Sequence, residues 1–300
     1  MALINGTKRA DKIHGTDGND TINGREGNDT FYGSGGDDRI DGGSGWDKID
    51  YAGYGGRLEI VLKSSGESYL YGDGVLRDTL VSVEEILGGN GDDYFAGNGR
   101  KNIFSGGKGH DYILASNGDD VYRGGNGYDM VDFSKIKTGL KFAIDSATGV
   151  TSVRHGENLA TMTGVENVIG TKYGDVIKGT GANNYFLGMG GNDTLIGGAG
   201  GDGLNGGTGN DKLTGGADDD VFEFNTGFGR DTITDFNSRN GEHDILDFKD
   251  VAAIRSYDQL ISEGRIAQNG SDVHIDAANG DMIILKNVDI ASLSASDFLF

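Results

Sequence analysis

The sequence predicts an all-β fold: a parallel β-roll, or β-solenoid, of stacked nine-residue repeats, with two inserted spacer coils and a C-terminal capping β-rich subdomain. Sixteen copies of the pattern G-G-x-G-x-D-x-U-x, where U is a large apolar residue, recur in register along the 300 residues. The chain contains 56 glycines, and a glycine-rich composition with a strict period is typical of a solenoid. It contains no proline, so every backbone N–H stays available for pairing between successive coils.

The repeats fall into three blocks, which hold five repeats in 1–50, five in 88–132 and six in 170–223. Two spacers of 37 residues lie between the blocks, at 51–87 and 133–169. The first glycines of the three blocks, Gly6, Gly88 and Gly170, are each 82 residues apart. The sequence therefore has a second, longer period of 82 residues, made of one block and one spacer, in addition to the nine-residue period.

Position eight of each repeat is apolar, whereas positions seven and nine are mostly polar. This alternation predicts a three-residue strand that points one side chain inward and two outward. A single repeat buries almost nothing, so only a run of stacked repeats forms a continuous core. The predicted core residues are Ile13, Ile22, Phe31, Ile40, Ile49, Phe95, Phe104, Ile113, Tyr122, Val131, Ile177, Phe186, Leu195, Leu204, Leu213 and Phe222.

The two spacers match each other and are predicted to be larger coils of the same stack. Apolar residues alternate at Leu58, Ile60 and Leu62 in the first spacer and at Leu140, Phe142 and Ile144 in the second. This alternation is typical of a half-buried strand. Both spacers end alike, with VEEIL at 83–87 and VENVI at 165–169, directly before the next block. We therefore expect inserted coils, not independent domains or flexible linkers.

The pattern changes after residue 223, and we expect 224–300 to cap the end of the stack. Two strands are predicted in 227–236 and 244–248. The dipeptide Asn279-Gly280 lies between two apolar-bearing runs in 272–288, which predicts a β-hairpin.

A short helix is predicted between these strands and the hairpin. Ser256 and Gln259 stand three residues apart, the spacing of a capping box at a helix N-terminus. Gly264 supplies the left-handed conformation at which such a helix ends.

The turns of the repeats combine the oxygen donors that Ca2+ prefers. Glycines free the backbone to curl its carbonyls inward, and the aspartate at position six adds a hard anionic oxygen. Ca2+ takes roughly six to eight oxygen ligands, more than one turn supplies, so two turns stacked about 4.8 Å apart must share each ion. If successive repeats alternate between two sides of the roll, the three blocks bind about ten ions. The predicted ligands are Asp11, Asp20, Asp29, Asp38, Asp47, Asp93, Asp111, Asp120, Asp129, Asp175, Asp193, Asp202, Asp211 and Asp220.

Two repeats carry asparagine at position six, Asn102 and Asn184, and they occupy the same place in their blocks. Asparagine keeps a carbonyl oxygen but loses the charge, so any calcium site there should be weaker. Position four of the same repeats is also not glycine; it is Arg100 in one and Ala182 in the other. Drift at a tolerated position and a selected weak site are both open interpretations.

The formal net charge is −21, from 47 acidic and 26 basic residues. This balance argues against a general phosphate-binding surface and therefore against nucleic acid as a partner. Acidic side chains at fixed turn positions would repel one another unless a cation lay between them, which favours metal binding. The absence of cysteine excludes disulfides, thiol catalysis and thiolate metal sites.

No apolar run approaches the roughly 18–20 residues needed to span a bilayer, and no amphipathic helix of useful length occurs. Residues 1–15 lack the apolar stretch of a secretory signal peptide. The sequence therefore does not favour a membrane partner. Export would need a route without an N-terminal signal.

The nonapeptide resembles the repeats-in-toxin (RTX), or hemolysin-type, calcium-binding family, whose repeat forms a calcium-binding parallel β-roll. The resemblance covers 144 residues of repeats directly. The chain is similar to the repeat regions of serralysin-like proteases, to the R-modules of alginate C5-epimerases and to small repeat-only secreted calcium binders of nodule-forming rhizobia. The resemblance implies an extracellular protein that a type I secretion system exports unfolded, reading the uncleaved ending SASDFLF at 294–300. It also implies folding on extracellular calcium, since carboxylates that repel each other in the ion-free chain become ligands.

We expect no enzyme activity. Many relatives carry a catalytic domain before the repeats, but here the repeats begin at residue 6. The chain contains neither the HExxH motif of zinc proteases nor the G-x-S-x-G motif of lipases. Pairs such as Asp37-Asp38 and Asp92-Asp93 suggest a glycosidase dyad, but their place in the repeat turns favours a structural role.

The interaction partner is less well specified, and an acidic exopolysaccharide or a cell surface is our leading hypothesis. Aromatic groups at exposed edges can stack on sugar rings, although ordinary packing is the alternative. The candidates are Trp46, His110 and Tyr128 at position five, and Tyr51, Tyr54, Tyr69 and Tyr71 in the first spacer. The alternative functions are a carbohydrate-active enzyme, such as a polysaccharide epimerase, lyase or hydrolase, and a membrane-active signalling protein.

Overall fold

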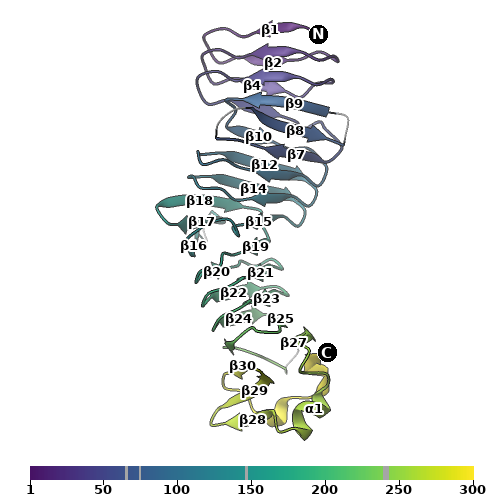
Figure 1. The fold of residues 1–300 in the computed structure, drawn as a ribbon, viewed down its shortest axis with the longest axis vertical. Coiled ribbons are helices and arrows are strands. Elements are labelled where there is room, and N and C mark those ends of the chain that lie inside the picture. The colour runs from purple at the N-terminus through teal and green to yellow at the C-terminus, as the bar shows by residue number, and fades with distance from the viewer. Residues whose placement is uncertain (65–66, 74–75, 146–147, 239–242) are drawn as a thin grey trace. The chain divides into compact units, whose positions relative to one another are not determined.

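Each of the sixteen repeats forms one short strand, and successive strands alternate between two parallel sheets in the computed structural model (Figure 1). The structure describes residues 1–64, 67–73, 76–145, 148–238 and 243–300. It divides into two compact parts. The N-terminal part comprises Met1–Lys135, Asp145–Val153 and Glu157–Val165, and the C-terminal part comprises Ile136–Ile144, Arg154–Gly156 and Glu166–Phe300.

The register of the strands confirms the predicted stacking. Each repeat pairs with the next but one, so that Ile22 is in register with Ile40 and Phe31 with Ile49. All sixteen side chains at position eight are buried, between 0% and 7% exposed. Burying one such side chain contributes about 1.5–3 kcal/mol, so the stack is stabilised by many small, similar increments.

The N-terminal part contains two sheets. The first has the order β1-β3-β5-β9-β8-β7-β11-β13-β15 and the second the order β2-β4-β6-β10-β12-β14-β18. The strands of the first sheet are β1 (Leu3–Asn5), β3 (Thr21–Asn23), β5 (Arg39–Asp41), β7 (Leu58–Val61), β8 (Ser68–Gly72), β9 (Leu76–Val81), β11 (Tyr94–Ala96), β13 (Tyr112–Leu114) and β15 (Met130–Asp132). The strands of the second are β2 (Lys12–His14), β4 (Thr30–Tyr32), β6 (Lys48–Asp50), β10 (Glu85–Leu87), β12 (Ile103–Lys108), β14 (Val121–Asn126) and β18 (Asn158–Thr163).

The first spacer forms a three-stranded antiparallel meander within the first sheet, a detail that the sequence pattern did not predict. β8 pairs antiparallel with both β7 and β9. β9 and β7 then pair in parallel with the flanking repeat strands β5 and β11. Leu58, Ile60 and Leu62 are buried, as predicted. The spacer thus widens the sheet while the repeats on either side remain in register.

The second spacer contributes β16 (Leu140–Asp145), β17 (Val150–His155) and β18, and its last residues form β19 (Asn167–Ile169). Leu140 and Phe142 are buried, as predicted, whereas Ile144 is only partly buried. The larger coil therefore uses the same inward alternation as the repeats.

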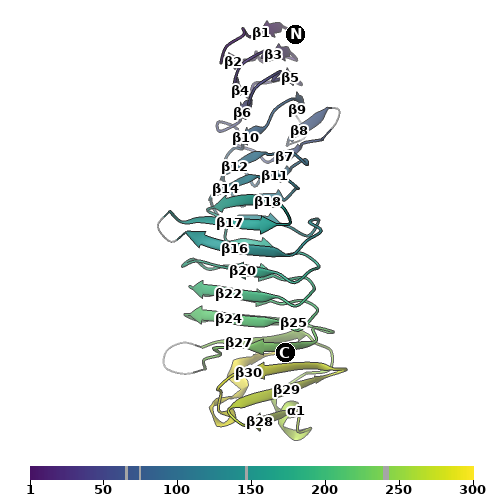
Figure 2. The same ribbon diagram turned by 90° about the vertical axis from the view of Figure 1, so that its left-hand side faces the viewer.

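The C-terminal part continues the same architecture with strands of its own. One sheet has the order β19-β21-β23-β25-β27-β31, and in the other β16 pairs with β20, followed by β22, β24, β26, β30, β29 and β28. Figure 2 shows β20, β22 and β24 side by side, as their parallel registers require. The bounds are β20 (Val176–Lys178), β21 (Tyr185–Leu187), β22 (Thr194–Ala199), β23 (Gly203–Asn205), β24 (Lys212–Ala217), β25 (Val221–Asn225), β26 (Arg230–Ile233), β27 (Ile245–Asp250), β28 (Ile266–Asn269), β29 (Asp272–Ala278), β30 (Asp281–Leu285) and β31 (Phe298–Leu299).

The last strands close this end of the stack with a hairpin. β29 and β30 pair antiparallel across Asn279-Gly280, where both residues take the positive φ of a tight hairpin turn, 57° and 96°. β30 also pairs in parallel with β26, so the hairpin is joined to the last coil. The predicted hairpin is present.

One α-helix, α1 (Tyr257–Ser262), precedes the hairpin, and two single 3-10 turns, η1 (Ile290–Ser292) and η2 (Ala295–Asp297), follow it. The Ser256 hydroxyl accepts the N–H of Gln259 at 3.1 Å, as predicted, and Gly264 has a φ of 65°. The return bond of a capping box differs, because the Gln259 side chain accepts the N–H of Arg255 at 2.9 Å. No helix among the described residues is long and apolar enough to cross a membrane.

Candidate functional site

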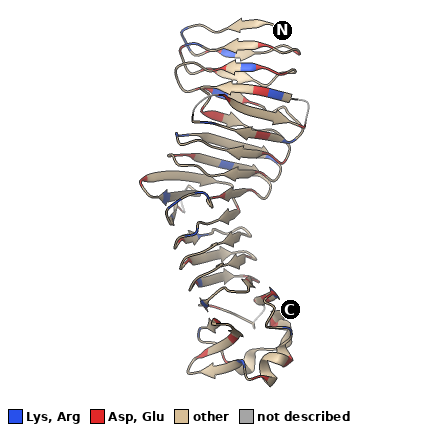
Figure 3. Ribbon diagram, in the orientation of Figure 1, with Lys and Arg blue, Asp and Glu red and all other residues tan. Residues whose placement is uncertain are grey.

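The aspartates at position six line the interior of the turns. Thirteen of the fourteen predicted ligands are buried, between 0% and 3% exposed, and only Asp11 in the first repeat is partly accessible. Figure 3 shows acidic residues at many of the turns that join successive strands. A buried carboxylate is costly unless it is paired or hydrogen-bonded, so these side chains need partners.

One oxygen of every predicted ligand except Asp11 is fixed by the neighbouring coil. The Asp47 Oδ1 atom accepts the N–H of Asp29 at 2.8 Å, and the Asp211 Oδ1 atom accepts the N–H of Asp193 at 2.7 Å. Within a block the donor is the residue at position six of the repeat next but one, 18 residues earlier. Asp93 and Asp175, in the first repeats of their blocks, accept instead from Leu58 and Leu140 of the spacers, 35 residues earlier. These bonds stack the carboxylates into columns along each side of the roll, which we call the aspartate ladder.

The second oxygen divides the ladder into two classes. In the first class, Oδ2 is buried and has no hydrogen-bond partner among the described residues. Members of this class are Asp29, Asp47, Asp111, Asp193, Asp202, Asp211 and Asp220, together with Asp231, which lies in the coil after the last repeat and whose Oδ1 accepts the N–H of Asp211. Because these oxygens are buried and have no hydrogen-bond partner among the described residues, a bound cation would supply the interaction that they lack.

In the second class the protein itself supplies a donor to Oδ2. Asp20 Oδ2 accepts both the N–H and the hydroxyl of Thr16 at 2.7 Å. Asp120 Oδ2 accepts the Ser116 hydroxyl at 2.9 Å and the Tyr122 hydroxyl at 2.8 Å. The other members are Asp11, Asp38, Asp93 and Asp175. These carboxylates depend less on a cation.

The pKa values of the buried carboxyls reflect this environment. Burial is the main cause and raises the pKa of Asp47, Asp93, Asp202 and Asp211 to about 6, that of Asp111 and Asp220 to about 7, and that of Asp193 and Asp231 to about 8. At Asp193 the charges of Asp211 and Asp175 add to the effect. Only a nearby positive charge would keep all these groups ionised at neutral pH.

The glycines at position one leave room beside the second oxygen. A Cβ added at Gly24 would lie 2.3 Å from Asp29 Oδ2 and 2.4 Å from the carbonyl oxygen of Gly42. At Gly188 the same distances to Asp193 Oδ2 and the Gly206 carbonyl oxygen are 2.3 and 2.4 Å. These turns therefore bring a carboxylate oxygen and a backbone carbonyl together where a side chain would intrude.

This donor set fits Ca2+. All the available donors are hard oxygens, from carboxylates and glycine carbonyls, and Ca2+ favours such ligands. Among the described residues no three Asp, Glu, His or Cys side chains gather closely enough to hold a metal by themselves. Backbone carbonyls must therefore complete any site, which explains why glycine is so frequent in the turns.

Substitution of the position-one glycine will test the fit. We expect Gly188→Ala to lower the free energy of unfolding in calcium by about 1–3 kcal/mol, because the methyl group overpacks against Asp193 Oδ2 and the facing carbonyl. Gly181→Ala is the matched control, since a Cβ there meets nothing within 4 Å. Urea denaturation at saturating calcium measures both, and equal effects of the two variants would contradict the assignment.

The structure adds three aspartates that the sequence prediction missed. Asp78 Oδ1 accepts the N–H of Asp38 at 2.9 Å, Asp231 Oδ1 that of Asp211 at 2.9 Å, and Asp244 Oδ1 that of Asp220 at 3.1 Å. Asp231 could have been predicted from the sequence, because residues 227–233 read G-F-G-R-D-T-I, a degenerate form of the repeat. Asp78 and Asp244 keep only an apolar residue two positions later, which is too short a pattern to identify.

The two asparagines interrupt the ladder at equivalent coils. Asn102 Oδ1 accepts the N–H of Asn98 at 3.1 Å, within its own turn. Asn184 Nδ2 donates to the carbonyl of Glu166 at 2.9 Å. An aspartate could not make this bond, because an ionised carboxylate has no hydrogen to donate. The neighbouring coil carries a glutamate at position six in both cases, Glu84 in one and Glu166 in the other. At each of these two positions, an aspartate would therefore place its carboxylate opposite a glutamate carboxylate, and asparagine avoids that pair of like charges.

The aromatic candidates occupy unequal environments. Trp46 is partly buried, with its indole N–H 3.3 Å from Glu85 Oε2 and Lys101 Nζ 5.7 Å from its ring. Tyr128 is 56% exposed and stacks on His110 with ring centroids 5.9 Å apart. Tyr69 and Tyr71 stack on each other at 6.2 Å, whereas Tyr51 is buried. Of the position-five candidates, Tyr128 and His110 are exposed, whereas Trp46 is only partly so.

The family model of the RTX calcium-binding nonapeptide repeat matches residues 5–40, 24–53, 96–131, 169–204 and 202–233, which together cover half of the chain. RTX nonapeptide repeats bind Ca2+. No curated protein matches the chain.

The solved structures similar to the chain include a lipase and two epimerase subunits. The match to the extracellular lipase LipA from Serratia marcescens has 20% identity and a TM-score of 0.39, and it covers 98% of this chain but only 39% of the lipase. The AlgE6R2 subunit of the mannuronan C5-epimerase from Azotobacter vinelandii has 28% identity and a TM-score of 0.35, covering 45% of this chain and 92% of the subunit. The AlgE6R3 subunit of the same enzyme has 29% identity and a TM-score of 0.34, and the match covers 43% of this chain and 79% of the subunit.

The repeats, the β-roll and the ladder of buried aspartates agree with the family match. The chain belongs to the family of proteins built from RTX calcium-binding nonapeptide repeats.

Proposed function

We propose that this protein is secreted, folds when it meets extracellular calcium, and then acts without catalysis as an interaction module for a cell surface or a polysaccharide. The first class of the aspartate ladder is the observation that carries the proposal. Its Oδ2 atoms are buried and unpartnered among the described residues. An ion-free fold would have to desolvate these carboxylates without compensation, whereas bound calcium supplies the missing charge.

We propose that about ten ions bind at full occupancy, in two groups of different affinity. Coils whose facing carboxylates belong to the first class, such as Asp193 with Asp211 and Asp202 with Asp220, should fill first. Coils in which threonine, serine or tyrosine already donates to Oδ2, such as that of Asp120, should fill later or stay empty. Asn102 and Asn184 would then mark the weakest positions.

Export of an unfolded chain by a type I system agrees with the state of the ending 294–300 in the fold. Asp297 is 2% exposed and accepts the N–H of Ser294 at 2.7 Å. Phe298 stacks near Phe248 with ring centroids 6.2 Å apart. A secretion machinery that reads this segment would therefore have to do so before calcium folds the protein.

The role as an interaction module is supported by the exposed pair Tyr128 and His110 and by the lack of a recognisable catalytic motif. The carboxylate pairs that suggest a glycosidase dyad divide between two environments, since Asp38 is buried in the ladder and Asp37 is not. No particular feature of the described residues favours a polysaccharide-modifying or membrane-active role.

Circular dichroism during calcium titration of ion-free protein tests the proposal. We expect the strand signal to appear cooperatively with calcium and to disappear on chelation. Magnesium should fail at equal concentration, because it demands octahedral geometry and dehydrates reluctantly. A strand signal already complete in chelator would contradict calcium-dependent folding.

Binding to an acidic exopolysaccharide, measured with and without calcium, tests the interaction role separately. Saturable binding that requires calcium and weakens in Tyr128→Ala is expected, and screening for uronate release or epimerisation would expose a hidden enzyme.

A further inference from the structure

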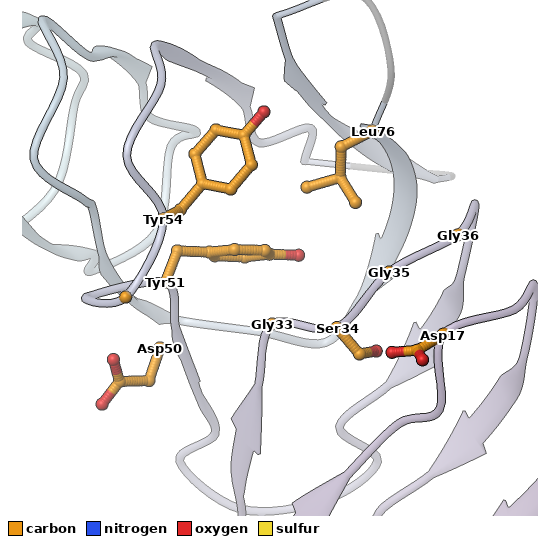
Figure 4. A pocket seen from close by; sticks show the side chains of 10 residues that line it. Asp17, Gly33, Ser34, Gly35, Gly36, Asp50, Tyr51, Tyr54 and Leu76 are labelled. Carbon is orange, nitrogen blue, oxygen red and sulfur yellow. The ribbon is translucent and has the colours of Figure 1, made fainter.

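A cavity in the N-terminal part lies where the turns of repeats 15–23 and 33–41 meet the start of the first spacer (Figure 4). Its volume of about 540 Å³ lies within the roughly 300–1,000 Å³ of small-ligand sites. The side chains that define it are Asp17, Ser34, Asp50, Tyr51, Tyr54 and Leu76.

The floor of the cavity is fixed by Tyr51. This side chain is 3% exposed and its hydroxyl is bonded to the buried Asp78 carboxylate. Its ring also fills the space above Gly33, where a Cβ would lie 2.3 Å from Tyr51 Cδ1. Because the ring is held before any ligand arrives, little ordering would be needed on binding.

The walls of the cavity are apolar. Figure 4 shows the Tyr54 ring and Leu76 on opposite sides of the space above Tyr51. The backbone of Tyr54 is anchored, because its N–H donates to the Tyr51 carbonyl at 2.7 Å and its carbonyl accepts the Asn90 N–H at 2.9 Å. The Tyr54 ring itself stays partly exposed. Such a ring can stack on the C–H face of a sugar.

The other end of the cavity offers hydrogen-bond acceptors. Asp17 is exposed and its carboxylate accepts no hydrogen bond from the described residues. The Ser34 hydroxyl donates to Asp38 Oδ2 at 2.7 Å, which leaves its lone pairs available. Asp50 is already engaged by the Ala52 N–H at 3.0 Å and by Lys48 Nζ at 3.6 Å. The Asp17 carboxylate and the Ser34 hydroxyl oxygen are therefore the free acceptors at this end.

The cavity combines aromatic and aliphatic walls with a free carboxylate, and its lining contains no lysine or arginine. A neutral pyranose fits both ends, because its C–H face meets Tyr54 and Leu76 while its hydroxyls donate to Asp17 and Ser34. Uronates and sulfated sugars would be repelled by Asp17 and Asp50. We propose that this cavity binds a neutral pyranose unit of a glycan. The inference rests on the proposed role as a polysaccharide interaction module and specifies the sugar class taken at this site.

The test uses the full chain loaded with calcium. Saturation-transfer NMR and isothermal titration with methyl hexopyranosides and neutral oligosaccharides identify binding, and oligouronates of equal length serve as the acidic comparison. Tyr54→Ala should weaken neutral-sugar binding about tenfold or more through loss of the stacking face, and Tyr54→Phe should restore it. Asp17→Asn should weaken it severalfold. Tyr173→Ala, which removes an exposed tyrosine in the C-terminal part, is the matched control and should have no effect.

The outcomes separate this proposal from the proposed function. If no neutral sugar binds, or if binding is unchanged in both Tyr54→Ala and Asp17→Asn, the cavity proposal is overturned. Calcium-dependent binding of acidic polysaccharide that depends on Tyr128 would still support the interaction role. Should Tyr54→Ala fail to fold on calcium, Asp17→Asn decides alone, because its side chain is exposed and unpartnered within the described residues.

Discussion

Asp193→Asn will stabilise the ion-free protein and destabilise the calcium-loaded protein. The Asp193 carboxylate has a pKa raised to about 8, mainly by burial, and its Oδ2 has no partner among the described residues. Without calcium, removing this buried charge should raise the free energy of unfolding by about 1 kcal/mol. With calcium, loss of a charged ligand should lower it by about 1.5–3 kcal/mol. Urea denaturation at saturating calcium measures the second sign. The concentration of a stabilising osmolyte that folds the protein in chelator measures the first, because such an osmolyte favours the folded state.

Asp20→Asn is the matched control at the same position of a repeat. Its Oδ2 accepts two bonds from Thr16, and hydrogen bonds from the Thr16 hydroxyl and N–H lower its pKa. Asparagine there loses favourable charge-assisted bonds, so the ion-free protein should become less stable. The natural asparagines at 102 and 184 show that position six accommodates the amide. The same sign for both variants in chelator would contradict the division of the ladder into two classes.

Much of the fold could be predicted because its period is short and strict. Each repeat predicts a three-residue strand with one inward apolar residue. The burial of Ile22, Phe104 and Leu213 could therefore be predicted from the repeat alone, without knowledge of distant contacts. The pairing of each repeat with the next but one follows once successive repeats are assumed to alternate between the two sides of the roll. The hairpin at Asn279-Gly280 has an equally local cause, the positive φ that both residues adopt.

The rest could not be predicted, because it depends on contacts distant in sequence. The antiparallel β8 adds strands inside a parallel sheet, and no local pattern distinguishes its apolar residues from those of an extra coil. The distinction between Asp29, with an unpartnered Oδ2, and Asp120, with Tyr122 and Ser116 as donors, requires side-chain positions. Asp78 enters the ladder only because the meander brings β9 beside β5.

The same ladder gives the protein opposite pH dependences with and without calcium. In the unfolded chain aspartates titrate near pH 3.9, whereas the folded ion-free protein has carboxyl pKa values raised to about 6 at Asp47 and Asp211, 7 at Asp111 and 8 at Asp231. Between about pH 4 and 8 the folded state therefore binds more protons than the unfolded state, and its stability must fall as pH rises through these values.

Calcium reverses this slope, because the ion binds the deprotonated carboxylates and competes with protons. We expect the osmolyte concentration that folds the protein in chelator to rise steadily from about pH 5.5 to pH 8. At fixed limiting calcium we expect the midpoint of thermal unfolding to rise over the same range. Asp272, whose pKa a hydrogen bond from Lys286 lowers to about 2, contributes with the opposite sign only below about pH 4 and does not mask the effect. Circular dichroism during osmolyte titration in chelator and during thermal melts at limiting calcium gives the two pH dependences. Stability that falls with rising pH under both conditions would mean that the buried aspartates are not the groups that calcium and protons share.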